Sequence, residues 1–482
     1  MTVKDLNAVS MRALLSKLRK NNIQVRLADG ELSIKYHKEK IEQDLLDEIL
    51  FHKTALIDYL STFSRNGHTA LTKAEERADY PLSSSQRRLW VLSQFEQGSV
   101  AYNMPGVYNF EGQLDITALS FAFNMLIQRH ESLRTIFRQT DQGEPRQLIL
   151  PADVATSAFR IVYTDLQKEP KEVLRRHIEQ DLKQPFDLVK GPLIRASLYQ
   201  VAANRWVFTY VMHHICGDGW SMEILIRELL SFYMQHLKGE QPSPAPLSIQ
   251  YKDYACWLEQ QLIGDALALH KKYWMQQLQG AIPVLKLPVD KSRPAVKTYN
   301  GSSINKRISA ELTAALRTVC NRQDATLFMG LLASVATLLY HYSEQQDIII
   351  GSPVAGREHM ELNDQVGCYL NTLALRLRLD KQFSFTDLLQ HTRQITLDAY
   401  QHQVYPFDKL IEDLQLQRDM SRSPLFDVLI DYHDLKTRTQ QEGQAFDGIN
   451  LRISPLGNSA QPVSKFDLTF MFIDSQDGLN LL

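Results

Sequence analysis

The heptapeptide HHICGDG, residues His213 to Gly219, separates a predicted strand from a predicted helix. The residues before it, Arg205 to Met212, form a nearly continuous run of apolar, β-branched and aromatic side chains, which is typical of a buried strand. After it, apolar residues recur at helical spacing, with Ser221 as the expected N-cap and Gly239 closing the helix. The loop between them is suited to acyl transfer, because its glycines let the backbone approach a ligand and a helix N-terminus favours negative charge.

The side chains of the loop support the same interpretation. An imidazole titrates near neutral pH and accepts a proton from a nucleophile when a neighbour fixes its tautomer, and Asp218 is close enough in sequence to do so. A single histidine beside a strand is more often structural, but two adjacent histidines followed by Asp-Gly favour a function. Metal binding is the weaker alternative, and we assign no metal ligands, because adjacent side chains leave a strand on opposite faces and neither a cysteine nor a pair of carboxylates completes a ligand set.

Composition narrows the class of protein. The 482 residues are 44% hydrophobic and 22% charged, and the formal net charge is −2, which leaves no basic surface for nucleic acid. No apolar run approaches the length of a membrane span and no signal segment follows Met1, so we expect a cytoplasmic protein. The four cysteines are scattered without CxxC pairing, which favours reduced thiols over disulfides or zinc.

Residues 1–64 are predicted to form a separate small unit of order αββαα. Residues 23–27 and 32–36 alternate apolar and polar side chains around Asp29-Gly30, which indicates a β-hairpin. Residues 12–40 contain eight basic and three acidic residues. This excess favours an acidic peptide partner, although a solvated face, or a unit that only stabilises its neighbour, explains it as well. Residues 65–79 are polar and are predicted to be a linker.

From residue 80 onward, helical and strand patterns alternate, which indicates an α/β (α+β) fold. In the second half, Leu312 to Tyr342 is predicted to be helical and Asp347 to Ile350 to be a buried strand.

The ordered motifs of the chain resemble a condensation domain of a nonribosomal peptide synthetase, a bacterial enzyme of secondary metabolite biosynthesis. HHICGDG matches the HHxxxDG signature of that family at every fixed position, and Cys216 occupies one of its variable positions. Seven further stretches resemble family motifs in the family order: LSSSQRRLW (82–90), RHESLRTIF (129–137), YKDYACW (251–257), GSPVAGR (351–357), VGCYLNTL (366–373), HQVYPFDKL (402–410) and RDMSRSPLFD (418–427). An ordered set spread over most of the chain is a strong signal.

The resemblance implies two lobes, each like chloramphenicol acetyltransferase, arranged as a V-shaped pseudo-dimer with HHICGDG at the junction. We therefore assign residues 80–260 to an N-terminal lobe and residues 261–482 to a C-terminal lobe. Family members continue past KFDLTF (465–470) for a further strand and helix, so we expect this sequence to be a fragment of a larger synthetase.

The resemblance also implies the reaction. Two peptidyl carrier proteins would present substrates on phosphopantetheine arms, so that the chain itself binds no cofactor. The amine of the acceptor aminoacyl thioester would then attack the donor thioester. His214 is expected to act as the base or as the group that positions the amine, and the sequence leaves both roles open. His213 is expected to be structural, and Gly219 to offer its amide to the developing oxyanion.

Asp218 is expected to form a salt bridge with Arg357 rather than to contact substrate. The residues expected to line the substrate tunnel are Trp220, Ser221 and Asn371, although an apolar wall or a capped helix start accounts for the first two as well.

The first 64 residues are similar to docking domains of the TubC type, which receive the C-terminal tail of the preceding synthetase subunit. Arg26 and Lys35, with Val25 and Ile34 on the same hairpin, are the expected contacts for that tail. SVAYNMP (99–105) and LSSSQRRLW look like the subtype that joins an L-donor to an L-acceptor.

Two alternatives remain open. The first is a stand-alone acyltransferase that uses coenzyme A thioesters, which the docking unit argues against. The second is a catalytically silent recruiting module, which the intact signature residues argue against.

Overall fold

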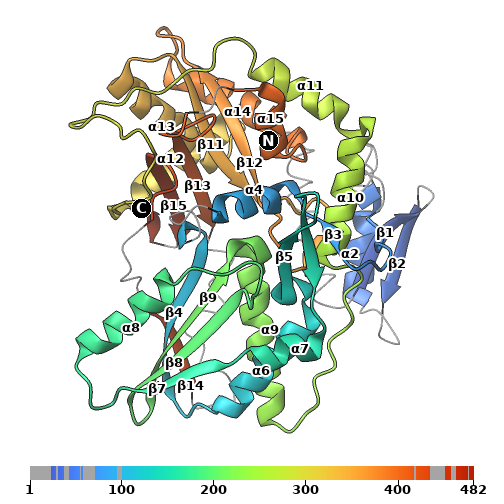
Figure 1. The fold of residues 1–482 in the computed structure, drawn as a ribbon. Coiled ribbons are helices and arrows are strands. Elements are labelled where there is room, and N and C mark those ends of the chain that lie inside the picture. Colours follow the sequence, from blue (N-terminus) through green and yellow to red (C-terminus); the bar gives the residue numbers. More distant parts are fainter. Residues whose placement is uncertain are drawn as a thin grey trace.

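The computed structural model describes residues 23–28, 31–36, 43–54, 56–57, 71–94, 100–416, 419–434, 451–456, 463–475 and 477–482. Beyond the N-terminal hairpin, these residues form two lobes, which lie one above the other in Figure 1. Helix α4 (Ser84–Ser93) lies where the lobes meet, and helix α10 (Tyr251–Ile263) runs alongside the junction.

The predicted N-terminal hairpin is confirmed. Strands β1 (Ile23–Ala28) and β2 (Glu31–Tyr36) are antiparallel, and their register pairs Val25 with Ile34. The same register pairs Gln24 with Lys35, and helix α2 (Gln43–Phe51) follows. The predicted first helix and the Asp29-Gly30 turn lie outside the described residues.

The lower lobe in Figure 1 is built on a five-stranded sheet of order β14-β4-β9-β8-β7, in which β14 spans Leu451–Pro455. Its central strand, β9 (Arg205–His213), is buried along most of its length, as its continuous apolar sequence predicts. All neighbours in the sheet are antiparallel except β7 and β8. The other regular elements of this lobe are β3 (Tyr80–Pro81), β4 (Asn103–Gly112), α6 (Ile116–Arg129), β5 (Thr135–Gln139), β6 (Pro145–Ile149), α7 (Ala152–Ala158), β7 (Ile161–Asp165), α8 (Lys171–Lys183), β8 (Ile194–Ala202) and α9 (Gly219–Leu237).

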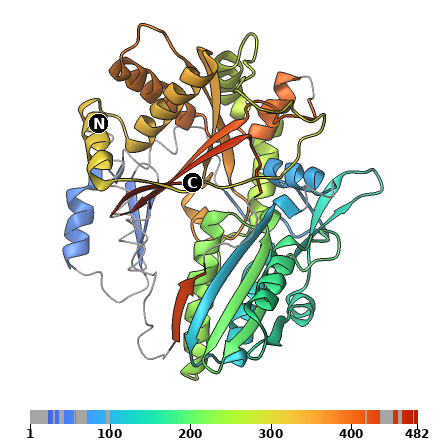
Figure 2. The same cartoon turned by 90° about the vertical axis from the view of Figure 1, so that its left-hand side faces the viewer.

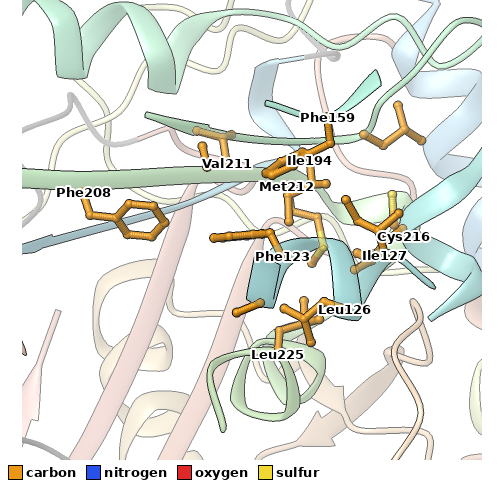
Figure 3. Packing of buried hydrophobic residues seen from close by; sticks show 14 of the residues in the cluster. Phe123, Leu126, Ile127, Phe159, Ile194, Phe208, Val211, Met212, Cys216 and Leu225 are labelled. Atoms are coloured by element: carbon orange, nitrogen blue, oxygen red, sulfur yellow. The ribbon is translucent and has the colours of Figure 1, made fainter. Parts of the chain in front are cut away.

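A hydrophobic core fills the space between this sheet and helices α6 and α9. Phe123 and Leu126 of α6 meet Met212 of β9 and Leu225 of α9 in this core (Figure 3). The side chain of Cys216 lies in the same core, so the thiol of the HHICGDG loop points into the lobe interior. Burial raises the pKa of this thiol.

The upper lobe is built on a six-stranded sheet of order β10-β16-β15-β13-β11-β12, with its own hydrophobic core. The predicted strand at Asp347 is confirmed as β11 (Asp347–Val354). The other regular elements are α11 (Ala268–Gln277), β10 (Lys306–Ile308), α12 (Ala310–Arg322), α13 (Leu327–Ser343), β12 (Asn371–Arg378), α14 (Phe385–Gln401), α15 (Phe407–Leu414), β13 (Val428–Asp434), β15 (Leu468–Ser475) and β16 (Gly478–Leu481).

The predicted helical stretch from Leu312 to Tyr342 consists of two helices. Helix α12 ends at Arg322, and the side chain of Thr326 caps α13 by accepting a hydrogen bond from the backbone N–H of Met329. No single helix in the described part of the chain is long and apolar enough to cross a membrane. The α12–α13 pair meets that test only when both helices are taken together, and it is bent by 103°.

The division into contiguous lobes at residue 260 is wrong in two respects. Strand β14 (Leu451–Pro455) returns to the first lobe and pairs with β4 as the edge strand of its sheet, as Figure 2 shows. Helix α10 also spans the proposed boundary without a break. The C-terminal part of the chain therefore contributes to both lobes, which fastens them together through the backbone.

Part of the predicted linker packs onto the first lobe. The backbone N–H of Ala74 donates a hydrogen bond of 2.9 Å to the Asp253 carboxylate on α10. Arg146 binds the Asp79 carboxylate at 2.8 Å. Residues 71–79 are thus irregular in backbone but anchored at several points.

Candidate active site

The HHICGDG loop joins β9 to α9 through a single short turn. His213 ends the strand, residues His214–Cys216 form a 3-10 turn, and α9 begins at Gly219. The predicted cap was wrong: Asp218, not Ser221, is the N-cap, because its Oδ1 accepts a hydrogen bond of 2.8 Å from the backbone N–H of Ser221. A Cβ atom at position 217 would lie 2.5 Å from the Cε of Met212, so any larger residue there would require the Met212 side chain to move.

The expected contact between Asp218 and Arg357 is present, and it joins the two lobes. Arg357 Nη2 lies 3.0 Å from Asp218 Oδ1, and each side chain is only 2% exposed. Asp218 Oδ2 also accepts a hydrogen bond of 3.1 Å from the backbone N–H of Tyr369, and the Arg357 guanidinium lies 4.3 Å from the centre of the Tyr369 ring. Arg357 Nη1 donates to the carbonyl groups of Leu362 and Gln365. All of these contacts are with protein groups that hold the loop in place. The surroundings of Asp218 are therefore those of a structural residue.

Ser221 belongs to this same buried network. Its side chain is fully buried, and its hydroxyl contacts Asp218 Oδ1 at 2.7 Å, Arg357 Nη2 at 3.0 Å and the backbone of Gly367. The prediction that Ser221 lines a substrate tunnel is therefore wrong. Gly367 leaves no room for a side chain, since a Cβ atom there would lie 1.9 Å from the Tyr251 ring.

His213 is buried in the first lobe, with 1% of its surface exposed. Its Nδ1 accepts a hydrogen bond of 3.2 Å from the backbone N–H of Ile215, which fixes the neutral tautomer that carries the proton on Nε2. Burial, together with the neighbouring His214 and the positive charge of Lys465, lowers its pKa to about 3. These contacts suit a residue that shapes the loop.

His214 is partly buried and lies at the lobe junction. Its backbone N–H donates to the carbonyl of Tyr102 at 2.9 Å, and its imidazole Nδ1 lies 3.8 Å from the Cys368 thiol of the other lobe. Burial lowers its pKa to about 4, and the positive charge of Lys465 contributes in the same direction. At neutral pH the imidazole is therefore uncharged, which is the form that accepts a proton or a hydrogen bond.

Comparison with known proteins agrees with this geometry. The family model for the condensation domain matches residues 76–481, and the model for the TubC N-terminal docking domain matches residues 11–62. The chain belongs to the condensation domain family. The predicted family and the docking unit are both confirmed.

The relatives of this condensation domain include very large peptide synthases. The chain is 41% identical to one of the linear gramicidin synthase subunits of Brevibacillus parabrevis, over 86% of this chain and 8% of that protein. It is 37% identical to bacitracin synthase 3 of Bacillus licheniformis, over 94% of this chain and 7% of that protein. The chain thus spans less than a tenth of the length of either relative.

Solved structures confirm the predicted condensation fold. The X-domain from teicoplanin biosynthesis superposes with a TM-score of 0.76 at 24% identity, covering 86% of this chain and 90% of that one. A four domain nonribosomal peptide synthetase bound to AMP and glycine gives a TM-score of 0.74 at 24% identity, covering 84% of this chain and 31% of that one.

A cavity of about 1590 Å³ lies between the lobes of the condensation domain. Its wall includes Arg88 and Tyr102 from the first lobe and Asp408, Phe426 and Lys465 from the second. His214 itself is not part of the wall, but two residues that interact with it are. The Tyr102 ring packs edge-on against the His214 ring, and the Lys465 charge lowers the pKa of His214. It is large enough for an extended substrate arm.

The other predicted tunnel residues are not part of the wall of this cavity. Trp220 is 40% exposed and its indole N–H donates to the carbonyl of Asn363 at 3.0 Å. The Asn371 side chain donates to the carbonyl groups of Gln403 and Tyr405 and accepts from the backbone N–H of Phe407 at the start of α15. Asn371 lines a separate pocket of about 30 Å³. Gly219 begins α9 with open space beside it.

Sequence reasoning gave no role to Tyr102, Lys465, Arg88 or Asp408, although each lies within a stretch that resembles the family. All four are charged or aromatic residues within motif-like stretches, and no structural role had been predicted for them. That combination is the sequence signal by which they could have been identified. Their common location was out of reach because they come from four segments far apart in the chain.

The low pKa of His213 predicts a pH dependence of stability. Its folded pKa of about 3 lies below the ordinary value of 6.5, so the unfolded chain binds the proton first as the pH falls. Stability from this group is complete above about pH 6.5 and is lost progressively below it. Between pH 7 and pH 5 we expect wild type to lose about 2 kcal/mol more unfolding free energy than His213→Asn, which retains an acceptor for the Ile215 N–H but does not titrate. Urea denaturation at both pH values measures the difference, and equal losses in the two proteins would contradict the prediction.

Proposed function

We propose that this condensation domain forms an amide bond between two carrier-bound substrates in nonribosomal peptide synthesis. The observation that carries the proposal is an uncharged His214 held at the lobe junction beside a cavity with walls from both lobes. The acceptor amine attacks the donor thioester carbonyl, the C–N bond forms, the C–S bond breaks, and one amine proton moves to the carrier thiol. Membership of the condensation domain family and the peptide synthases among the relatives support this reaction.

His214 acts on the acceptor amine, either as the base that takes its proton or as the hydrogen-bond acceptor that orients it. Orientation carries much of the rate, since well-placed reactants gain on the order of 7–11 kcal/mol of barrier. Asp218 and Arg357 hold the loop, as their buried contacts indicate, and the Gly219 amide is a donor to the oxyanion. The phosphopantetheine groups belong to the carriers, and the donor and acceptor are both of L configuration.

The docking unit receives the C-terminal tail of the upstream synthetase subunit, which brings the donor substrate. The basic excess of residues 12–40 supports an acidic tail. In the hairpin register, Arg26 pairs with Ser33 and Lys35 pairs with Gln24, so alternation along the strands places positions 26 and 35 on one face. Val25 and Ile34 pair with each other on the opposite face, where the tail would make apolar contacts.

The test is a single-turnover assay in which dipeptidyl-carrier is followed by intact-protein mass spectrometry. The full chain is mixed with a donor aminoacyl-carrier and an acceptor aminoacyl-carrier, and we expect dipeptide on the acceptor. A parallel reaction offers the same donor as free coenzyme A thioester. If product forms only with the coenzyme A thioester, the stand-alone acyltransferase is favoured. If neither reaction gives product, the recruiting module is favoured.

A further inference from the structure

Lys465 is a cation at the reaction site to which no role has been assigned. It precedes β15 in the second lobe, and its ammonium lies 4.6 Å from the centre of the Tyr102 ring of the first lobe. Tyr102 in turn faces His214, with ring centres 6.5 Å apart, and its carbonyl holds the His214 backbone. Lys465 also lines the large cavity. The ammonium therefore lies at the junction of the lobes, on the cavity wall and beside the tyrosine that contacts His214.

The other cations of the cavity wall are all occupied by acceptors. Arg88 lies 3.3 Å from Asp408, Arg422 is paired with Asp427 and Lys409 is paired with Glu412. Arg87 lies 3.8 Å from Glu144, and Lys297 donates to Ser423 at 2.7 Å. For the Lys465 ammonium, the described part of the chain offers the Tyr102 ring face but no carboxylate, carbonyl or hydroxyl hydrogen-bond acceptor. A largely buried charge without an anion costs stability, so its retention points to a ligand.

The electrostatics of the site agree with this geometry. The titratable groups around Lys465 are Arg88 on α4, Tyr102 before β4, His213 and His214 of the signature loop, and Cys368 before β12. Burial and the positive charge of Arg88 lower the pKa of Lys465 to about 8. The lysine is therefore still charged at neutral pH, and its charge lowers the pKa of both His213 and His214.

We propose that Lys465 is a catalytic residue of the condensation reaction, whose ammonium stabilises the oxyanion that forms on the donor thioester. The inference rests on the proposed function. As the amine attacks, the C–N bond forms and the carbonyl electron pair moves to oxygen. Collapse of that oxyanion expels the carrier sulfur, which receives the amine proton. Lys465 remains protonated throughout, and a fixed charge of this kind in a site shielded from water is effective because it needs no reorganisation.

The test compares Lys465→Met, Lys465→Arg and the control Lys381→Met, which removes an exposed lysine of the same lobe. With saturating carriers, we expect Lys465→Met to lower the single-turnover rate constant about 10²–10³-fold, as the loss of one oxyanion donor does elsewhere. We expect Lys465→Arg to stay within about tenfold of wild type, because the charge remains. The melting temperature of Lys465→Met should equal or exceed that of wild type, since an unpaired buried charge is removed.

A pH series separates catalysis from a structural role. Above pH 8, wild type loses the Lys465 charge but the arginine variant retains it. The ratio of the Lys465→Arg rate to the wild-type rate should therefore rise about tenfold from pH 7 to pH 9. Histidine NMR, assigned with His214→Gln, should show the pKa of His214 rising in Lys465→Met.

The outcomes are distinguishable. If the wild-type chain forms no dipeptide in the single-turnover assay, the proposed function and this inference are both overturned. An active wild type with Lys465→Met within about threefold of it overturns this inference alone, as does a variant that loses rate only through weaker carrier binding. A constant rate ratio across pH also overturns it.

Discussion

We expect Arg357→Met to lower the free energy of unfolding by roughly 3–5 kcal/mol. The substitution leaves the Asp218 carboxylate 2% exposed and without its only cationic partner among the described residues. It also removes the Arg357 donor from the Gln365 carbonyl, and from the Leu362 carbonyl, which keeps the backbone N–H of Gln365. The loss of unfolding free energy arises because buried polar groups lose their partner, and it does not measure the intrinsic strength of the ion pair. Urea denaturation followed by fluorescence and circular dichroism measures it.

The matched control is Arg227→Met. Arg227 also contacts a carboxylate of the other lobe, at 3.4 Å from Asp364, but the two side chains are 51% and 64% exposed. Water and salt screen such a pair, so we expect a change below about 1 kcal/mol. If Arg357→Met were as mild as this control, the buried pair would not be what fixes the HHICGDG loop.

A double-mutant cycle with Asp218→Asn tests the pair itself. Asparagine still caps α9, so this substitution removes the charge while it retains an acceptor for the Ser221 N–H. We expect the two substitutions to be strongly non-additive, because the second no longer strands a charge. Lost activity in either variant then reports the shape of the loop and gives no proof of chemistry at Asp218.

The sequence allowed the surroundings of HHICGDG to be predicted because their signals are local. A continuous apolar run fixed β9, and helical spacing with Gly239 fixed the length of α9. The cap was misplaced because Asp218 and Ser221 are both good capping residues, and only the fold shows whose side chain meets which N–H.

The features that were mispredicted depend on contacts between distant segments. Strand β14 belongs to the first lobe because it pairs with the edge of β4, and the local sequence of β14 does not indicate which strand it pairs with. Ser221 is buried because Arg357 and Gly367 arrive from the other lobe. The approach of Lys465 to Tyr102 is of the same kind, so the cavity and its cation emerged only from the three-dimensional structure.

Replacing His214 with alanine is expected to lower the single-turnover rate constant for dipeptide formation about 10²–10⁴-fold, the usual contribution of a positioned proton acceptor. Folding should be retained, since the backbone N–H of His214 still bonds the Tyr102 carbonyl. The control His341→Ala removes an exposed histidine of α13 and should leave the rate unchanged.

His214→Gln separates the two roles of the imidazole. The glutamine amide accepts a hydrogen bond but takes no proton near neutral pH. If His214 is a base, the glutamine variant loses as much rate as the alanine variant; if it only orients the amine, the glutamine variant should remain within about tenfold of wild type. Its pKa of about 4 makes the imidazole a weak base, so this pKa favours orientation as the outcome. A folded alanine variant with the wild-type rate would remove His214 from both roles and leave proximity within the cavity as the source of catalysis.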